Sequence, residues 1–318
     1  MFARTFGRGT RMTHAGVAAF ALVAGGAGPV TAQALFESRQ LTPAGEYTSG
    51  IEGPAVDATG VLYVVNFERK GTIGRLPVGA ARSELFARLP EGSIGNGIRF
   101  DPEGRMYVAD FKKHNVLVFE RGQSAARVYF HSPRFNQPND LAIAADGTLY
   151  ATDPSFARRT GQIWRITRGP GREGRGEVMS SERRMGVTNG LDLSPDGLTL
   201  YVSESNTREV WAYRLEGAKL AAPRLVKKFG EGELDGLRTD VDGRIFVTRP
   251  PQGRVAVLTP DGTLVREVQL RGKSPTNLSF GGPDGKTVFV TQADGRFIEA
   301  FSVDRPGREP CLQVRAAC

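Results

Sequence analysis

Hydrophobic and polar positions alternate in short runs along the chain, and one unit of this pattern recurs six times. Each copy starts with a polar residue, continues as an apolar strand, turns, and returns as a second apolar strand. The copies are "EGPAVDATGVLYVVN" from Glu52, "NGIRFDPEGRMYVAD" from Asn96, "NDLAIAADGTLYATD" from Asn139, "NGLDLSPDGLTLYVSES" from Asn189, "DGLRTDVDGRIFVTR" from Asp235 and "NLSFGGPDGKTVFVTQ" from Asn277. Their first residues lie 44, 43, 50, 46 and 42 positions apart. Spacing this regular indicates a repeat architecture.

The turns and the segments between the copies predict the type of repeat. Four copies turn at an Asp–Gly pair (146–147, 196–197, 242–243 and 284–285), which is a hairpin signal because glycine accepts positive φ. A third apolar strand follows every hairpin, and a more variable fourth strand follows in four copies, at 84–88, 126–130, 224–229 and 264–270. Four antiparallel strands per 45 or so residues, without a helical pattern, predict an all-β, six-bladed β-propeller of four-stranded blades.

The two ends of the chain complete this prediction. No fourth strand follows residues 296–303, so we expect residues 38–49 to complete the last blade and close the ring. Ahead of them, residues 1–34 combine three arginines, a short apolar core and the small-residue sequence Ala32-Gln33-Ala34. This is typical of a secretory signal peptide, and it predicts an exported, periplasmic or extracellular propeller domain over 35–318.

Charge and cysteines narrow the function classes. Removal of residues 1–34 leaves 39 basic and 34 acidic residues, a net charge of +5 instead of +8. The arginines are dispersed, which disfavours nucleic-acid binding, and no other segment is apolar enough to cross a membrane. We expect the basic run 168–184 to be a solvated loop. Cys311 and Cys318 either close a small terminal loop through a disulfide or stay free.

The six first residues of the repeats are the strongest candidates for chemistry. The innermost strands of a propeller line a central channel, so equivalent positions at their starts meet around its axis. Asn and Asp favour turns, which accounts for single cases such as Asn96 or Asn189. It does not account for Glu52 at the same phase, nor for two carboxylates directed into one channel, which a cation would compensate. Oxygen-only ligands favour Ca²⁺, with Mg²⁺ or Mn²⁺ as alternatives.

Four of the motifs resemble a known family. "GIEGP", "NQPNDLAIAADGTLYATDP", "TNGLDLSPDGLTLYVSES" and "DGLRTDVDGRIFVT" are similar, in this order, to the gluconolactonase, senescence-marker-protein and luciferin-regenerating-enzyme family. The resemblance implies a six-bladed propeller that hydrolyses lactones with one divalent metal, commonly calcium or zinc, in its channel. It also implies that the metal ligands are Glu52, Asn139, Asn189 and Asp235.

A mechanism consistent with the residues and the resemblance uses the metal to polarise a lactone carbonyl. Asp235 is the candidate general base, with a metal-bound hydroxide as the competing nucleophile. Glu52 acts as a charge-neutralising ligand. Asp140, next to Asn139, is expected to orient a metal ligand without binding the metal itself. Asn96 and Asn277 are candidates for the same supporting role or for substrate contacts.

Other side chains near these motifs have weaker claims. Some relatives carry an arginine two residues before the "ND" asparagine, where this chain has Gln137, and its nearest arginine is Arg134. His131 is a candidate proton carrier at the channel rim, against a surface or packing role. Trp164 and Trp211 share one phase of the third strand, which predicts packing between blades.

Two rival functions remain open at this point. A metal that polarises C=O also polarises P=O, so a phosphotriesterase would use the same site. A non-catalytic propeller could instead bind a protein or a carbohydrate around a structural metal, although paired carboxylates in the channel argue against it. The sequence leaves the natural lactone or ester substrate and the oligomeric state open.

Overall fold

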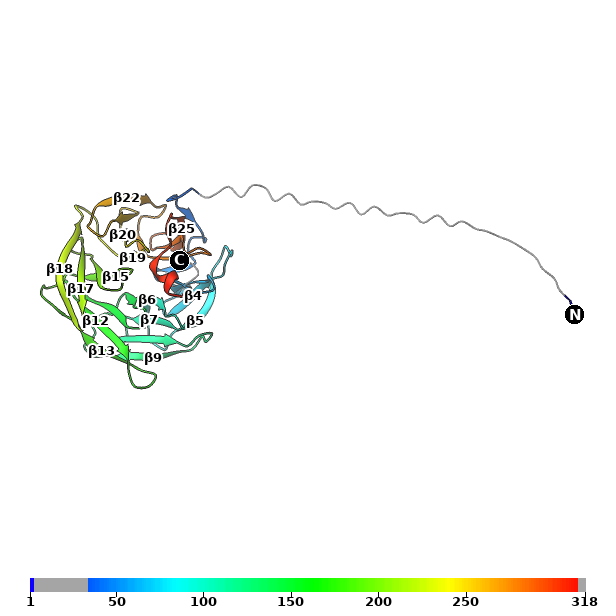
Figure 1. Cartoon of the computed structure of the whole chain (residues 1–318), viewed down its shortest axis with the longest axis horizontal. Helices are drawn as coiled ribbons and strands as arrows, with labels where there is room; N and C mark the ends of the chain where they lie inside the picture. The colour runs from blue at the N-terminus through cyan, green and yellow to red at the C-terminus, as the bar shows by residue number, and fades with distance from the viewer. Residues whose placement is uncertain (3–33, 314–318) are drawn as a thin grey trace. The chain divides into compact units, whose positions relative to one another are not determined.

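The computed structural model describes residues 1–2 and 34–313. Residues 34–313 form a ring of six blades (Figure 1). The predicted signal peptide falls on residues 1–34, of which 3–33 lie outside the described residues. None of the helices described is both long and apolar enough to cross a membrane.

Each blade is built on four antiparallel strands, and in blade four a short fifth strand pairs in parallel at the outer edge. Blades one and two contain β2 (Tyr47–Val56), β3 (Leu62–Phe67), β4 (Thr72–Leu76), β5 (Glu84–Arg88), β6 (Gly95–Phe100), β7 (Met106–Asp110), β8 (Asn115–Phe119) and β9 (Ala126–His131). Blades three and four contain β10 (Leu141–Ile143), β11 (Leu149–Ser155), β12 (Thr160–Arg168), β13 (Gly174–Val178), β15 (Thr188–Leu193), β16 (Thr199–Glu204), β17 (Glu209–Glu216) and β18 (Lys219–Lys228). Blades five and six contain β19 (Leu237–Thr239), β20 (Ile245–Arg249), β21 (Arg254–Leu258), β22 (Leu264–Gln269), β23 (Pro275–Gly281), β24 (Thr287–Gln292) and β25 (Phe297–Ser302).

The predicted fold and its closure are confirmed. Strand β1 (Arg39–Gln40) pairs antiparallel with β25, so the N-terminal segment supplies the fourth strand of the last blade. This pairing joins the two ends of the ring and removes an open sheet edge. The four Asp–Gly turns also form as predicted, with positive φ at Gly147, Gly197, Gly243 and Gly285.

The prediction of a solvated loop at 168–184 is wrong. Residues 174–178 form β13, the outer strand of blade three, and β14 (Ser180–Ser181) pairs parallel with β18 of blade four. The segment gave no strand signal because its exposed arginines alternate with glycines instead of apolar residues. A Cβ on Gly176 would lie 2.4 Å from the ring of Phe130, so only glycine lets β13 approach the neighbouring blade this closely.

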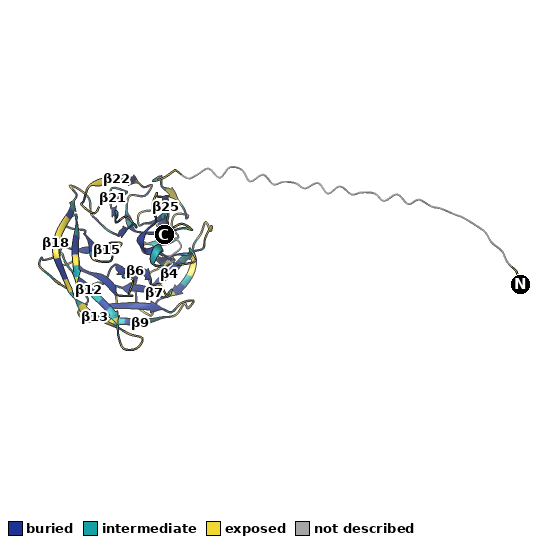
Figure 2. Ribbon diagram, viewed as in Figure 1, coloured by how far each residue is buried: buried dark blue, intermediate teal, exposed yellow. Residues whose placement is uncertain are grey.

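The apolar core lies between blades. The described residues contain six buried clusters, and each joins two adjacent blades; one, for example, combines Val65 and Ile73 of blade one with Val108 and Leu117 of blade two. Trp164 and Trp211 pack into two of them, as predicted. Figure 2 shows the consequence: the inner strands are buried, whereas outer strands such as β18 and β22 carry exposed residues.

Candidate metal centre

Five of the six predicted channel residues occupy equivalent places at one end of the inner strands. Glu52, Asn96 and Asn189 lie within β2, β6 and β15, and Asn139 and Asp235 shortly precede β10 and β19. We call these five residues the ring. Backbone hydrogen bonds between neighbouring blades fix their spacing: Gly97 N–H donates to Asn139 O at 2.8 Å, and Gly190 N–H donates to Asp235 O at 3.1 Å.

The local backbone explains how Glu52 reaches the channel. The β2–β3 register shifts on both sides of Glu52, which marks a bulge that re-aims the side chain. Gly53 follows with φ +57°, and a Cβ at this position would lie 1.9 Å from Asn96 O. Only glycine satisfies both conditions. Gly53 is therefore required by the contact between blades one and two.

In the sixth blade, the position equivalent to the five ring residues is occupied by Thr276. The repeat phase predicted for Asn277 is therefore wrong by one residue. Gly236 N–H donates to Thr276 O at 2.8 Å, the same bond that holds Asn139 and Asp235 in place. Leu278 and Leu141 pair equivalently with Val290 and Ala151, so Asn277 corresponds to Asp140. The sequence favours Asn277 at this position because three of the ring residues are also asparagines, whereas none is a threonine like Thr276.

The amide oxygens of the ring have no protein partner. The Oδ1 atoms of Asn96, Asn139 and Asn189 are all buried, and none accepts a hydrogen bond from the described residues. Buried polar atoms are nearly always satisfied, so three orphaned oxygens at equivalent positions call for a ligand. The amide nitrogen of Asn189, by contrast, donates to Ser205 Oγ at 3.1 Å.

Without a cation, burial disfavours the ionised forms of the two ring carboxylates. Burial raises the pKa of Glu52 to about 7. Burial, followed by the nearby negative charges of Glu52 and Asp140, raises the pKa of Asp235 well above its usual value. Asp235 nevertheless keeps part of its surface exposed. A cation between these groups would favour their ionised forms.

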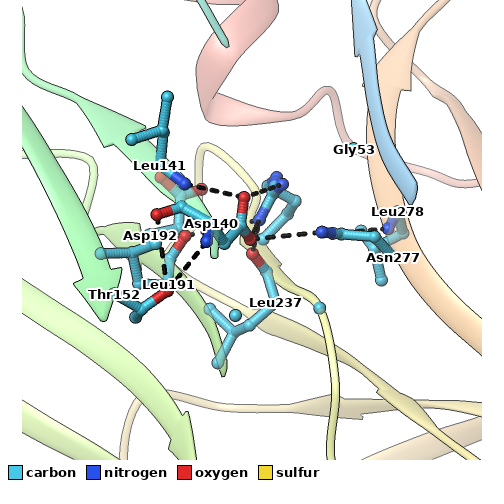
Figure 3. Close-up of polar contacts among 12 residues, drawn as sticks. Gly53, Asp140, Leu141, Thr152, Leu191, Asp192, Leu237, Asn277 and Leu278 are labelled. Carbon is cyan, nitrogen blue, oxygen red and sulfur yellow. Dashed lines mark hydrogen bonds and ion pairs between the residues drawn. The ribbon is translucent and has the colours of Figure 1, made fainter. Parts of the chain in front are cut away.

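A second layer of polar residues lies directly beneath the ring. Asn277 Nδ2 donates to Glu52 Oε2 at 3.0 Å. It also lies 3.3 Å from Asp140 Oδ2, and Figure 3 shows Asn277 pointing toward Asp140. Asp140 is completely buried and pairs with two arginines, Arg99 Nη2 at 3.0 Å and Arg238 Nη1 at 2.8 Å. We call Asp140, Asn277, Arg99 and Arg238 the support layer. The predicted supporting position of Asp140 agrees with this geometry.

The channel ends on a short C-terminal segment. Helix α1 (Arg308–Gln313), the pale red helix in Figure 3, places two charged residues against the support layer. Arg308 Nη2 lies 2.5 Å from Asp192 Oδ1, and Glu309 Oε1 lies 2.6 Å from Arg99 Nε. Cys311 in the same helix is disulfide-bonded, and Cys318 lies outside the described residues.

Charge balance supports a divalent cation in the ring. Among the described residues, the ring, the support layer and their charged contacts in β15 and α1 contribute five acids and three arginines, namely Glu52, Asp140, Asp192, Asp235, Glu309, Arg99, Arg238 and Arg308. When all are ionised, two negative charges are left over. The described residues contain no group of three His, Cys, Asp or Glu side chains that could hold a metal, so the donors are two carboxylates and three amides. This oxygen-only set fits Ca²⁺.

Two further predicted site residues lie away from the channel. His131 ends β9, the outermost strand of blade two, and its Nδ1 lies 2.9 Å from Asn115 Oδ1. Arg134 is exposed, with its guanidinium 5.5 Å from the Trp164 ring centre. Their closeness to Asn139 in sequence suggested a site role, but the chain crosses from the outer strand of one blade to the inner strand of the next within these residues.

Two cavities flank the channel region. A cleft of about 390 Å³ lies between the loops after β7 and β11, and it is lined by Phe111, Lys112, His114, Asn136, Gln137, Ser155, Ala157 and Arg158. Gln137, one of its lining residues, stands two residues before Asn139 in the sequence. A larger, mostly apolar cavity of about 600 Å³ lies against the turn at 57–60 and Gln313, and no ring residue lines it.

Sequence reasoning missed Arg99, Arg238 and Asp192, although the pattern contains a signal for them. Each stands three positions after a ring residue, and alternation along the strand gives this position the same face as the first position after the ring residue, where Asp140 and Asn277 stand. Arg308 and Glu309 follow the last repeat, so no periodicity could have placed them.

Comparisons with known proteins agree with this geometry. The sequence profile of the SMP-30/Gluconolactonase/LRE-like region matches residues 50–294. The chain is 27% identical to a gluconolactonase of Zymomonas mobilis over 64% of its own length and 63% of that protein, which is less than two thirds of the relative. It is 25% identical to the diisopropyl-fluorophosphatase of Loligo vulgaris over 85% of this chain and 94% of that one.

A solved structure confirms the fold. The calcium-binding protein regucalcin of Agrobacterium tumefaciens superposes with a TM-score of 0.68 over 85% of this chain and 97% of that chain, at 16% identity. At this identity the likeness shows the propeller fold alone.

Proposed function

Because the chain belongs to the SMP-30/gluconolactonase/LRE-like family, we propose that it is a lactone hydrolase that binds one divalent cation, preferably Ca²⁺, in its ring. The observation that supports this most strongly is the set of three buried amide oxygens that accept no hydrogen bond from the described residues, beside the buried carboxylate of Glu52 and the partly exposed carboxylate of Asp235. Similarity to a gluconolactonase supports the lactone substrate, and likeness to a calcium-binding propeller agrees with the choice of ion.

The roles of the ring residues follow from their contacts. Glu52 Oε2 accepts hydrogen bonds from Gly53 N and Asn277 Nδ2, so Oε1 is left for the ion. Asn96, Asn139 and Asn189 contribute their amide oxygens. When bound, the cation polarises the lactone carbonyl and stabilises negative charge on its oxygen.

Asp235 is the residue placed to accept a proton. It is the ring carboxylate with a partly exposed surface, so an attacking water can reach it and transfer a proton over a short distance. A lactone opened in this way gives a hydroxy acid, and the proton passes from the water through Asp235 to the leaving alkoxide. Glu52, held by two donors, neutralises charge.

The cleft of about 390 Å³ between the loops after β7 and β11 favours a substrate that carries polar or anionic groups. Lys112 and Arg158 line it together with the amide of Gln137 and the hydroxyl of Ser155. Such a lining suits the hydroxyls or a terminal acidic group of a sugar-acid lactone, and it offers little to an alkyl chain.

A lactone panel tests the proposal. Purified protein should be assayed with glucono-1,5-lactone, an anionic sugar-acid lactone and an unsubstituted δ-lactone, before and after EDTA treatment and readdition of Ca²⁺ or Zn²⁺. We expect hydrolysis that EDTA abolishes and a cation restores, with both sugar lactones preferred. Hydrolysis unaffected by EDTA, or no hydrolysis of any lactone, would contradict it.

Phosphotriester hydrolysis is a second candidate. The similarity to a diisopropyl-fluorophosphatase extends over most of both chains, further than the gluconolactonase match. The same panel should therefore include diisopropyl fluorophosphate, with fluoride release as the readout. Activity on this compound above that on every lactone would make it the primary function.

We also propose that the protein is exported. The support is the signal-peptide pattern of residues 1–34 together with the disulfide at Cys311, since disulfides persist in oxidising compartments. N-terminal sequencing of protein recovered from the periplasm or medium should begin at Leu35. Recovery of the uncleaved chain in the cytoplasm would contradict export.

A further inference from the structure

The segment 307–313 contacts the inner strand region of every blade. Its contacts are Gly307 with Asp240 after β19, Arg308 with Ile143 O in β10 and Asp192 in β15, Glu309 with Arg99 in β6, Gln313 with Val56 O in β2, and packing of α1 against β23. Val56 and Ile143 end their strands, whereas Asn139 precedes β10. The segment therefore closes the channel at the end opposite the ring, and we call it the floor.

The floor is connected to the ring through buried charges. Glu309 pairs with Arg99 at 2.6 Å, and Arg99 pairs with Asp140 at 3.0 Å. Asp140 Oδ2 lies 3.3 Å from Asn277 Nδ2, which in turn donates to Glu52 Oε2 at 3.0 Å. The arginine, Asp140 and Asn277 are at most 1% exposed, so solvent does not weaken these interactions.

This series of contacts fixes the position of a proposed cation ligand. Asn277 Nδ2 holds one oxygen of Glu52. The Asn277 amide is oriented by Asp140 Oδ2 together with Leu278 N–H, which donates to Asn277 Oδ1 at 2.9 Å. Asp140 is held in turn by Arg99 and Arg238, and Arg99 has a further anionic partner in Glu309. Without Glu309, Arg99 would keep one anion fewer and would pull Asp140 toward itself and away from Asn277.

We propose that Glu309 of the C-terminal floor is a positioning residue of the cation site, acting on Glu52 through Arg99, Asp140 and Asn277. The inference rests on the proposed function, since it needs the ring to bind a cation. Its consequence is that the C-terminal segment, which lies outside the repeats, contributes to cation affinity as well as to closing the channel.

The floor has anchors besides Glu309, so its docking can be separated from this role. Leu312 packs against the apolar cluster between blades two and three. Arg308 donates to Asp192 and to Ile143 O, and Gln313 donates to Val56 O. We therefore expect Glu309→Gln to leave the helix in place.

Calorimetric Ca²⁺ titration of the EDTA-treated full chain tests the proposal. Glu309→Gln should weaken Ca²⁺ binding by about 10–100-fold, the usual effect of removing a group that orients a metal ligand. Glu309→Asp, which keeps the charge, should recover part of the loss. The control is Arg305→Ala, since Arg305 precedes the same helix but pairs with Asp242 on the surface, at 2.7 Å. It should bind like wild type.

A double variant tests whether Glu309 affects Ca²⁺ binding through the series of contacts to Glu52, here called the relay, or through its charge alone. Asn277→Ala should weaken binding by itself, and adding Glu309→Gln should then cost little more, because both changes interrupt one series of contacts. Additive losses would overturn the relay, as would wild-type affinity in Glu309→Gln. If wild type binds Ca²⁺ and Glu309→Gln binds equally well, the proposed function stands and this inference fails. If wild type binds no divalent cation, the proposed function fails and takes this inference with it.

Discussion

The ring and the support layer lie next to each other in one channel, yet they are built differently. In the ring, three buried amide oxygens accept no hydrogen bond from the described residues, and two carboxylates lack a cationic partner of their own. In the support layer, Asp140 contacts two arginines, an amide and a backbone N–H. Among the described residues, the ring atoms without a hydrogen bond are oxygens, which a cation would satisfy, whereas those of the support layer are the Nε–H donors of Arg99 and Arg238. The acceptor atoms of Asp140 are all engaged, which suits a layer that holds the ring in shape.

The largest expected effect is on turnover. It should distinguish the two ring carboxylates, because Asp235 is proposed to accept a proton and Glu52 to neutralise charge. Asp235→Asn should lower kcat at saturating Ca²⁺ by about 10²–10⁴-fold, because it removes the proton acceptor. Glu52→Gln should mainly weaken Ca²⁺ binding and retain more turnover once the ion is saturating. Steady-state kinetics with measured ion content would decide. Equal losses that follow ion content in both variants would reduce Asp235 to a ligand.

In the support layer, the expected effect is on stability. Asp140→Asn should lower the free energy of unfolding by about 3–5 kcal/mol, because Arg99 and Arg238 would stay buried without their shared anion. Asp242→Asn is the matched control, since Asp242 pairs with Arg305 on the surface and should cost at most about 1 kcal/mol. Urea unfolding measures both. Similar values for the two would show that the support layer is not a buried ionic unit.

The pH dependence of stability distinguishes the empty ring from the occupied one. Burial raises the pKa of Glu52 to about 7, so this group makes the native state bind more protons than the unfolded chain between about pH 4 and 7. Without a cation, Tm should therefore fall as pH rises across this window, by several degrees. Saturating Ca²⁺ should flatten the decline, and Glu52→Gln should reduce it. A metal-free Tm that rises from pH 5 to 7 would contradict the account.

The smallest expected effect tests how closely the layers fit. A Cβ on Gly236 would lie 2.1 Å from Asn277 Oδ1, so Gly236→Ala should displace that amide and cost about 1–3 kcal/mol. Gly230→Ala is the control, because no atom lies within 4 Å of its added Cβ. Thermal unfolding in the presence of Ca²⁺ compares them. Equal stability of both variants would mean that Asn277 is free to move.

The fold and most of the ring could be predicted from the sequence because both repeat. Periodicity placed Glu52, Asn96, Asn139, Asn189 and Asp235 at one phase, and the structure brings them to one end of the channel. At Asn277 the same method failed by one position, because the hydrogen bonds between blades place Thr276 there.

What the sequence could not predict depends on contacts without periodicity. Strand β13 has no apolar alternation, and it is defined by pairing with β12. The floor lies after the last repeat. Glu309 contacts Arg99 of blade two because the six blades close into a circle. Nearness in sequence was misleading for His131, because blade geometry places it on an outer strand.

Ca²⁺ stoichiometry measured by equilibrium dialysis tests the central claim most directly. Wild type should be compared with Asn139→Leu and Asn189→Leu, which keep a similar volume but remove an orphaned amide oxygen. We predict one tightly bound ion per wild-type chain and a large loss of affinity in each variant, with the strand signal in circular dichroism unchanged. No bound ion in wild type, or equal binding in the well-folded variants, would contradict the account.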